Sequence, residues 1–208
     1  MDNCDEKRNH YSEQFSHRRM KIKYLIIFLV SLNIFPQEWE MLVENDVVTV
    51  SIEGNITVGD RHRFMFFPAK NLNPESSEVP CQLVHTYFSN YSMAENSVGN
   101  IDDLPSEYLL ASINEKEKFL ATAITAADFL LGSLTYFFAG RNTIEDLVSF
   151  YSEDDVITIE LLDFYDLDNQ ESLNLDINDY FDLPKNTWNL KGFEEAMKKG
   201  QEECLQIK

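Results

Sequence analysis

Short segments in which apolar and polar residues alternate run along the chain from residue 39 onward. The clearest is 47–53, where apolar residues at 48, 50 and 52 alternate with polar residues at 49, 51 and 53. A period of two is typical of a β-strand with one face on the core and one in solvent. We therefore expect strands at 39–44, 47–53, 56–58, 63–67, 83–88, 108–113 and 156–162, with a turn at Asn45-Asp46 and loops at 71–80 and 92–105.

The segment 116–131 is compatible with two structures. Apolar residues at 120, 124, 127, 131 and 134 recur at the spacing of a helix face, and Asn114 and Glu117 have the spacing of a capping box. The residues 122–125 favour a strand instead, because β-branched side chains dominate there. Helix and strand both stay open for 116–131, and a strand is predicted at 133–139. A membrane span is disfavoured, because Asp128 would lie near its centre.

Two further segments have the pattern of amphipathic helices. Residues 144–151 follow Asn142 and Glu145, which have capping-box spacing. Residues 190–205 follow Asn189, a good N-cap, and Trp188 and Phe193 occupy hydrophobic-staple positions. The expected buried stripe of this second helix is Phe193, Ala196, Met197, Gly200 and Cys204. The whole pattern predicts a mainly β, α+β fold: an antiparallel β-sandwich-like domain with two helices, near 143–151 and 190–205.

A basic start and a short apolar run precede the strands. Lys21 and Lys23 are followed by mostly apolar residues 24–35, which is typical of an export signal. We expect residues 20–37 to be a signal peptide or short hydrophobic anchor and 38–208 to be one acidic, β-rich domain. Our hypothesis is that translation starts at Met20, which makes residues 1–19 a polar extension upstream of the true start. The alternative interpretation is a buried core segment, and the chain would meet a membrane only through 24–35 if that segment is uncleaved. The expected location is periplasmic or secreted.

The number of cysteines that would remain after cleavage of the signal segment is consistent with export. The chain has three cysteines, and removal of residues 1–37 deletes Cys4 and leaves the pair Cys81 and Cys204. An oxidising compartment permits such a pair to bond. We expect a disulfide between them, and two buried free thiols are the alternative.

Charge limits the class of partner. The chain has a net charge of −19, and residues 38–208 hold 11 basic and 32 acidic residues, a net charge of −21. Such a surface repels nucleic acid and anionic lipid. It is compatible with a cationic partner or with bound divalent cations.

The sharpest chemical candidate is the acidic segment 142–184, which contains no lysine or arginine. Within it, Asp166, Asp168 and Glu171 partly resemble a calcium loop, whose ligands are oxygen atoms. The glycine required at loop position six is missing, and Ile177 stands at position twelve in place of glutamate. A solvated acidic loop is the simpler interpretation, and a calcium site is the alternative; no other cofactor is expected.

No catalytic residue can be named from the sequence. Residues 38–208 contain two histidines, His62 and His85, and neither lies at metal-ligand spacing from another histidine or a cysteine. We expect His62, between Arg61 and Arg63, to lie on a turn face or to pair with the acidic surface, and His85 to be a structural residue on a strand. No nucleophile elbow, zinc-protease motif or phosphate-binding glycine loop is present.

The end of the chain resembles a known family. The segment 188–196, from Trp188 to Ala196, followed by Cys204, is similar to the closing helix of small exported bacterial β-domain proteins of the invasion-associated-locus-B type. An early tryptophan, here Trp39, is similar too, whereas the long acidic segment is unlike that family. The resemblance implies export and a β domain whose last helix is tied back by a disulfide. It carries over no functional residue.

These observations predict an exported, non-catalytic binding or accessory protein. Its partner would be a protein or a small ligand, and not nucleic acid. Two alternatives stay open, a calcium-stabilised structural or adhesion-like module and a hydrolase that uses acidic residues.

Overall fold

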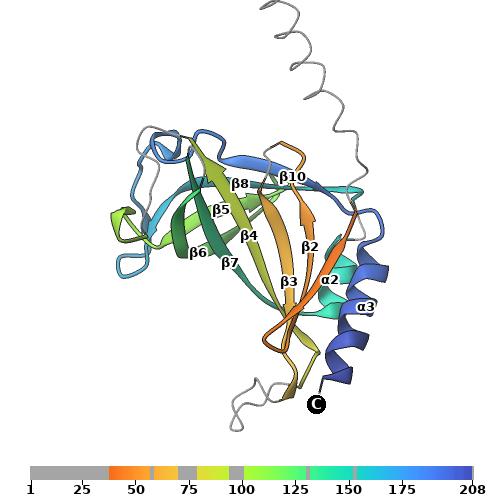
Figure 1. Ribbon diagram of the computed structural model, residues 1–208. Helices are drawn as coiled ribbons and strands as arrows, with labels where there is room; N and C mark the ends of the chain where they lie inside the picture. The colour runs from red at the N-terminus through yellow and green to blue at the C-terminus, as the bar shows by residue number, and fades with distance from the viewer. Residues whose placement is uncertain are drawn as a thin grey trace, which may run out of the picture. The chain divides into compact units, whose positions relative to one another are not determined.

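The alternating segments form the strands of one antiparallel sheet (Figure 1). The computed structural model describes residues 38–56, 59–69, 79–93, 101–129, 132–151 and 154–207. All of these residues belong to one compact unit. The strands are β1 (Glu40–Glu44), β2 (Val47–Glu53), β3 (Arg61–Phe66), β4 (Leu83–Ser92), β5 (Tyr108–Ile113), β6 (Glu117–Phe129), β7 (Gly132–Thr143), β8 (Val156–Asp166), β9 (Glu171–Ser172) and β10 (Lys185–Asn189). The helices are α2 (Ile144–Tyr151) and α3 (Phe193–Gln206), with short 3₁₀ turns η2 (Ile101–Asp103) and η3 (Ile177–Asp179).

Several expected segments lie outside the described residues. These are the polar extension 1–19, the signal-like segment 20–37, most of the loop 71–80 and part of the loop 92–105. The expected strand 56–58 is described only at Ile56, which is not in a strand. None of the helices in the described part of the chain is long and apolar enough to cross a membrane.

The sheet has the strand order β1-β2-β3-β4-β7-β6-β5-β8-β10, and β9 pairs with β8. Every neighbouring pair is antiparallel. The sheet curves so strongly that β10 reaches the end of β2 (Figure 1), where the backbone N–H of Asn55 donates to the carbonyl of Thr187 at 2.8 Å. The predicted mainly β fold with two helices is confirmed.

The segment 116–131, for which helix and strand were both expected, forms strand β6 (Glu117–Phe129). Asn114 and Glu115 have φ of 51° and 59°, so they form a tight turn between β5 and β6 and not a helix cap. The side chain of Asn114 holds this turn against β8 by accepting the backbone N–H of Thr158 at 2.7 Å. β6 then pairs with β5 on one edge and β7 on the other. Sheet pairing on both edges outweighs the helical spacing of the apolar residues.

Both predicted helices exist, but each begins differently from the expectation. Before α2, Thr143 supplies the side-chain cap: the Asp146 N–H donates to the Thr143 hydroxyl at 3.1 Å, and that hydroxyl donates to the Asp146 carboxylate at 2.7 Å. The predicted cap Asn142 is instead paired with Val84 in the sheet.

The predicted start of the last helix is wrong by three residues. Trp188 and Asn189 end strand β10, where Trp188 is buried in the core. Gly192, with φ of 81°, then turns the chain into α3. Glycine adopts this left-handed backbone conformation without steric cost. The helix therefore begins at a backbone turn, with no side-chain cap at Gly192. The Asn189 side chain accepts the N–H of Lys191 at 2.9 Å and so stabilises this turn.

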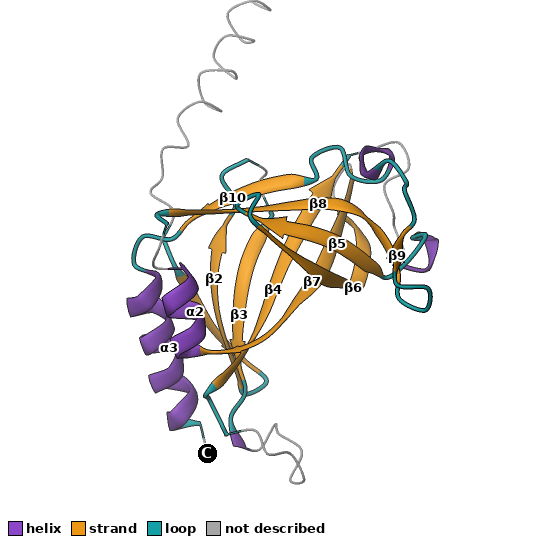
Figure 2. Ribbon diagram, turned by 180° about the vertical axis from the view of Figure 1, so that it is seen from behind, coloured by secondary structure: helices purple, strands orange, loops and turns teal. Residues whose placement is uncertain are grey.

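The two helices pack together against the β2 and β3 side of the core (Figure 2). Phe193, Met197, Gly200 and Cys204 of α3 are buried and Ala196 is partly buried, which confirms the predicted stripe. Gly200 is required there, because a Cβ atom would lie 2.7 Å from side-chain atoms of Val50 and Phe66.

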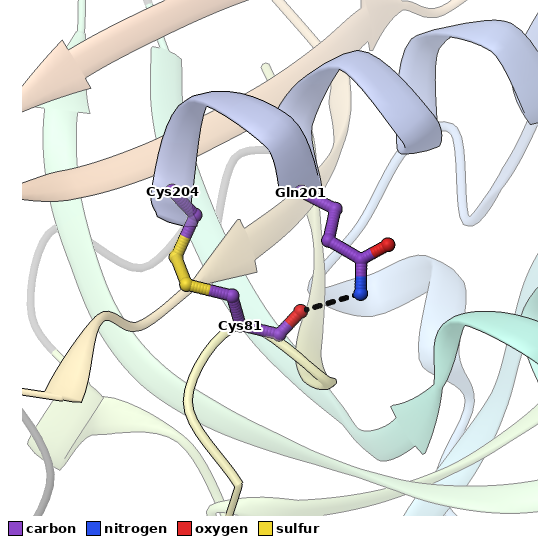
Figure 3. Close-up of a disulfide and its surroundings, with 3 residues drawn as sticks. All are labelled: Cys81, Gln201 and Cys204. Atoms are coloured by element: carbon purple, nitrogen blue, oxygen red, sulfur yellow. Dashed lines mark hydrogen bonds between the residues drawn. A yellow bond between two sulfur atoms is a disulfide. The ribbon is translucent and has the colours of Figure 1, made fainter. Parts of the chain in front are cut away.

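A disulfide joins Cys81, just before β4, to Cys204 in the last turn of α3 (Figure 3). The predicted bond is therefore confirmed, and it spans 123 residues of sequence. In the same place, the Gln201 side chain donates to the carbonyl of Cys81 at 3.2 Å. The bond and this hydrogen bond together fasten the end of α3 to the sheet.

Removal of the disulfide will destabilise the protein strongly. The double variant Cys81→Ala/Cys204→Ala releases a loop of more than one hundred residues in the unfolded chain. We expect its free energy of unfolding to fall by about 3–5 kcal/mol, since closing so long a loop limits unfolded-state entropy. Equilibrium urea denaturation measures this, and wild type in reductant is the matched control. Equal midpoints for all three samples would contradict the stabilising role.

Candidate functional site

Several outward-facing side chains of β3, β4 and β7 are aromatic or basic. These strands lie side by side (Figure 1), and buried and partly exposed residues alternate along β3 and along β4 as far as Phe88. The burial pattern of β7 is less regular. An antiparallel sheet with one wet face normally presents polar residues on it. We call the following outward residues the aromatic–arginine patch: Arg63, His85, Tyr87, Tyr136, Phe138 and Arg141.

Strand pairing brings the patch together from three segments of sequence. Arg63 stands opposite Tyr87, and Tyr87 stands opposite Phe138. His85 stands opposite Arg141. Phe138 and Arg141 are three positions apart and would face opposite sides in a regular strand. A β-bulge opposite Thr86 and Tyr87 inserts one residue into β7, and Gly140 beside it has φ of 117°, so both side chains align with the outer row.

The rings of the patch contact one another at an angle. The ring centroids of Tyr87 and Phe138 are 5.3 Å apart, and those of His85 and Phe138 are 5.8 Å apart. Phe67, just after β3, packs on His85 at 4.5 Å. These pairs have interplanar angles of 50–61°. The rings therefore form a ridged surface and not a single plane.

Arginine charge is concentrated here. The three arginines of residues 38–208 are Arg61, Arg63 and Arg141, and all lie on β3 or β7. The strands β3, β4 and β7 contain no aspartate or glutamate, although the domain has 32 acidic residues. Arg61 forms ion pairs with Glu53 on the adjacent strand β2 and with Glu40 on β1, the strand beyond it. The three strands that carry the patch therefore contribute only basic charged side chains to it.

Arg63 is held in place by its neighbours. Its guanidinium lies 4.9 Å from the centre of the Tyr136 ring, within the range of a cation–π contact. One nitrogen of the group also donates to the Ser89 hydroxyl at 3.0 Å. Burial lowers the pKa of Arg63, and the nearby Arg61 lowers it further. Because the side chain is already ordered, a partner that contacts it would lose little additional side-chain entropy.

The expectation for His62 is wrong. His62 is fully buried on the inner row of β3, where one ring nitrogen lies 3.0 Å from the Tyr151 hydroxyl and the other 3.0 Å from the Tyr87 carbonyl. Burial lowers the pKa of His62 to about 4, so the ring is neutral at physiological pH. The flanking arginines suggested an exposed position, but period-two alternation sends them outward and His62 inward. His85, by contrast, is on a strand as expected, with its ring in the patch.

A second buried ionisable group was missed by sequence reasoning. Asp60 is 0% exposed, and its carboxylate accepts the side-chain N–H of Asn186 at 2.6 Å and the backbone N–H of Tyr91. Burial raises its pKa to about 7, with a smaller contribution from Asp182. Gly59-Asp60 has the composition of an exposed turn, and only the approach of β10 covers it. This cluster joins three strands and stabilises the sheet.

The acidic segment is arranged as turns. Asp166 accepts the backbone N–H groups of Asp168 at 2.9 Å and Asn169 at 3.0 Å, and these bonds lower its pKa. Asp166 thus shapes the turn between β8 and β9; Asp168 lies within this turn, and Glu171 is the first residue of β9. In the ranges described, no group of three or more acidic, histidine or cysteine side chains is close enough to hold a metal ion. The calcium alternative therefore gains no support from this segment.

A shallow pocket of about 560 Å³ lies between α2 and the start of α3. Its apolar lining includes Val148, Tyr151, Leu190 and Phe193, and its charged lining includes Asp154, Asp155, Lys191 and Lys198. Charges of both signs surround it, and Tyr151 is already bonded to His62. Apolar, acidic and basic side chains are mixed in the pocket, whereas those of the patch are mainly aromatic and basic.

Comparison with known proteins found no matching protein-family model, no matching curated protein and no matching solved structure. The resemblance to invasion-associated-locus-B-type proteins therefore stays a prediction.

Ionisation of Asp60 will weaken the fold between pH 6 and 8. The folded protein keeps a proton on Asp60 up to about pH 7, whereas the unfolded chain loses it near its ordinary pKa of 3.8. Stability therefore falls as pH rises through the folded pKa. Between pH 6 and 8 the free energy of unfolding of wild type should fall by about 1.4 kcal/mol more than that of Asp60→Asn. Urea denaturation at a series of pH values measures both.

The comparison isolates Asp60 from His62. His62 has a lowered pKa in the folded state, so its contribution to stability is lost as pH falls below about 6.5, and this happens in both proteins. Asp60→Asn will also be less stable, because an amide has one acceptor oxygen and cannot accept both the Asn186 side-chain N–H and the Tyr91 backbone N–H. The diagnostic quantity is the difference in slope. Parallel curves for the two proteins would show that Asp60 is ionised in the fold at pH 6.

Proposed function

We propose that the protein is an exported, non-catalytic binding or accessory protein that docks a protein partner on the aromatic–arginine patch. One observation carries the proposal: two of the domain's three arginines, Arg63 and Arg141, and a cluster of partly exposed rings lie on three strands that have no acidic residue. Arginine and aromatic residues are enriched in the energetically important parts of protein interfaces. On a domain with so many acidic residues, a basic and aromatic surface of this kind is unusual, and we infer that it binds a partner.

The ring geometry favours a protein surface over a sugar chain. Tyr87, Phe138 and His85 are tilted by 42–61° relative to one another, so they do not make a flat platform for stacked sugar rings. The hollows between tilted rings fit single apolar side chains. Nucleic acid and anionic lipid are disfavoured, because the domain as a whole has a net charge of −21.

Charge complementarity defines the partner further. Arg63 and Arg141 flank the rings, and guanidinium groups bind carboxylates with good geometry. The proposed partner surface therefore has an apolar or aromatic side chain at its centre and aspartate or glutamate beside it. Carboxylates elsewhere on the partner would be repelled by the rest of the domain, so a compact docking segment is favoured.

Export is supported by the disulfide. The Cys81–Cys204 bond fits a compartment outside the reducing cytoplasm. The basic and apolar segment 20–37, which lies outside the described residues, has the composition of an export signal. We therefore place the binding role in the periplasm or among secreted proteins. Its accessory character is consistent with His62, the buried histidine, being closed off from any substrate.

A random-peptide selection tests the patch directly. Displayed 12-residue peptides are selected on the full chain, and the best binders are synthesised for titration calorimetry. We expect binders that combine aromatic or aliphatic residues with aspartate or glutamate. Phe138→Ala should weaken them at least tenfold, as for a central interface residue, and Arg141→Gln should weaken them several-fold.

The matched control is Leu175→Ala, which removes a side chain that is 38% exposed in the loop after β9. β9 pairs with β8, and β6 and β5 separate β8 from the patch strand β7 in the sheet. This variant should leave the affinity unchanged. Selected peptides that are basic, or that bind Phe138→Ala as well as wild type, would overturn the proposal.

A further inference from the structure

Strand β1 lies at the end of the sheet path and pairs only with β2 among the described strands. All five of its residues, Glu40–Glu44, are exposed. The central three are apolar, with exposed fractions of 48% for Met41, 58% for Leu42 and 45% for Val43. An edge strand presents a row of backbone N–H and C=O groups that can pair with another chain.

We propose that β1 is a strand-addition site for an extended segment of a partner protein, in which three apolar residues are flanked by lysine or arginine. In strand addition, backbone hydrogen bonds supply affinity and the alternating side chains supply specificity. This site is separate from the aromatic–arginine patch and does not rest on the function proposed for that patch.

The two faces of β1 differ in a way that defines the partner. Met41 and Val43 stand opposite Val50 and Val48, so they continue the inner face that α3 covers. Leu42 shares the other face with the two glutamates. A partner strand would therefore need apolar residues opposite all three central positions to extend both faces.

The glutamates determine which strand fits. Glu40 and Glu44 stand at the two ends of β1, with the apolar residues between them. Glu40 already forms an ion pair with Arg61, so the stronger selection for a basic residue is at Glu44. Opposite charges directly across an antiparallel pair are favourable, and like charges are unfavourable. A segment of the form basic, three apolar residues, basic is complementary, and the net charge of −21 on the domain attracts it.

A second copy of this chain is a poor occupant. Antiparallel pairing of two β1 strands about Leu42 would place Glu40 of each copy opposite Glu44 of the other. Charged residues on an edge strand are a common device against self-association. The glutamates thus disfavour self-pairing, and Glu44, which stands opposite the Glu40 end of a second copy, favours a basic partner residue.

Synthetic peptides test the site on the full chain. The probe is a nine-residue peptide that contains Lys-Val-Ile-Val-Lys between serine pairs, and the comparison peptide contains Glu-Val-Ile-Val-Glu. Binding is followed by the backbone amide NMR shifts of the protein. We expect the lysine peptide to shift the amides of β1 and the glutamate peptide to leave them unchanged. Methylation of alternate peptide nitrogens on the pairing edge should abolish the shifts, because strand addition requires those N–H groups.

Charge reversal completes the test. Glu44→Lys should weaken the lysine peptide roughly two- to fivefold and strengthen the glutamate peptide by a similar factor. Asp103→Lys, an exposed change of equal charge in η2, should alter neither preference beyond a small uniform effect. No β1 shifts at millimolar lysine peptide, shifts that survive methylation, or equal responses of Glu44→Lys and Asp103→Lys would each overturn the proposal. Phe138→Ala should leave the β1 shifts intact, which separates this site from the patch.

Discussion

The seating of α3 against β2 and β3 is the contact on which the rest of the structure depends. Gly200 lets the helix approach Val50 and Phe66 at a distance that a larger residue would prevent. Phe193 at the start of the helix packs on Phe64 and Tyr151 with ring centroids 5.1 and 5.0 Å apart. The Cys81–Cys204 bond holds the other end. The helix is thereby fixed at both ends and at its middle.

The packing of α3 determines which side chains of β3 are buried and which face outward. Once Phe64 and Phe66 turn toward α3, the period of two places His62 inside with them and sends Arg61 and Arg63 outward. Pairing then passes this choice to β4 and β7, and the bulge in β7 brings one further arginine to the outer face. A buried neutral histidine and an exposed basic patch are therefore two consequences of one strand register.

Sequence reasoning succeeded where local pattern and tertiary structure agree. The turn at Asn45-Asp46 connects β1 and β2, with positive φ at both residues, and 108–113 is a strand with the expected bounds. Only two cysteines remain beyond residue 37, and they form the predicted bond. For the acidic segment, no pattern in the sequence distinguishes ligands from turn-forming residues, and Asp166 belongs to the second class.

The errors arise where distant strands decide the outcome. Asn189 has the side chain of a helix cap, but its backbone completes β10 against Val156 of β8. The apolar spacing in 116–131 fits a helix, yet β5 and β7 pair with that segment on both edges. The patch itself was not predicted, because its members come from three separate segments and the bulge at Gly140 has no clear sequence signal. The absence of acidic residues from these strands was the available clue.

Hydroxyl-radical footprinting of the folded chain, read by tandem mass spectrometry, tests the central claim most directly. Phe137 and Phe138 are neighbours of identical chemistry, and the strand register places the first in the core and the second in the patch. Tyr87 and Phe88 form a similar pair on β4. The account predicts fast oxidation of Phe138 and Tyr87 and protection of Phe137 and Phe88. Protection of Phe138 together with oxidation of Phe137 would contradict the register and remove the basis for the patch.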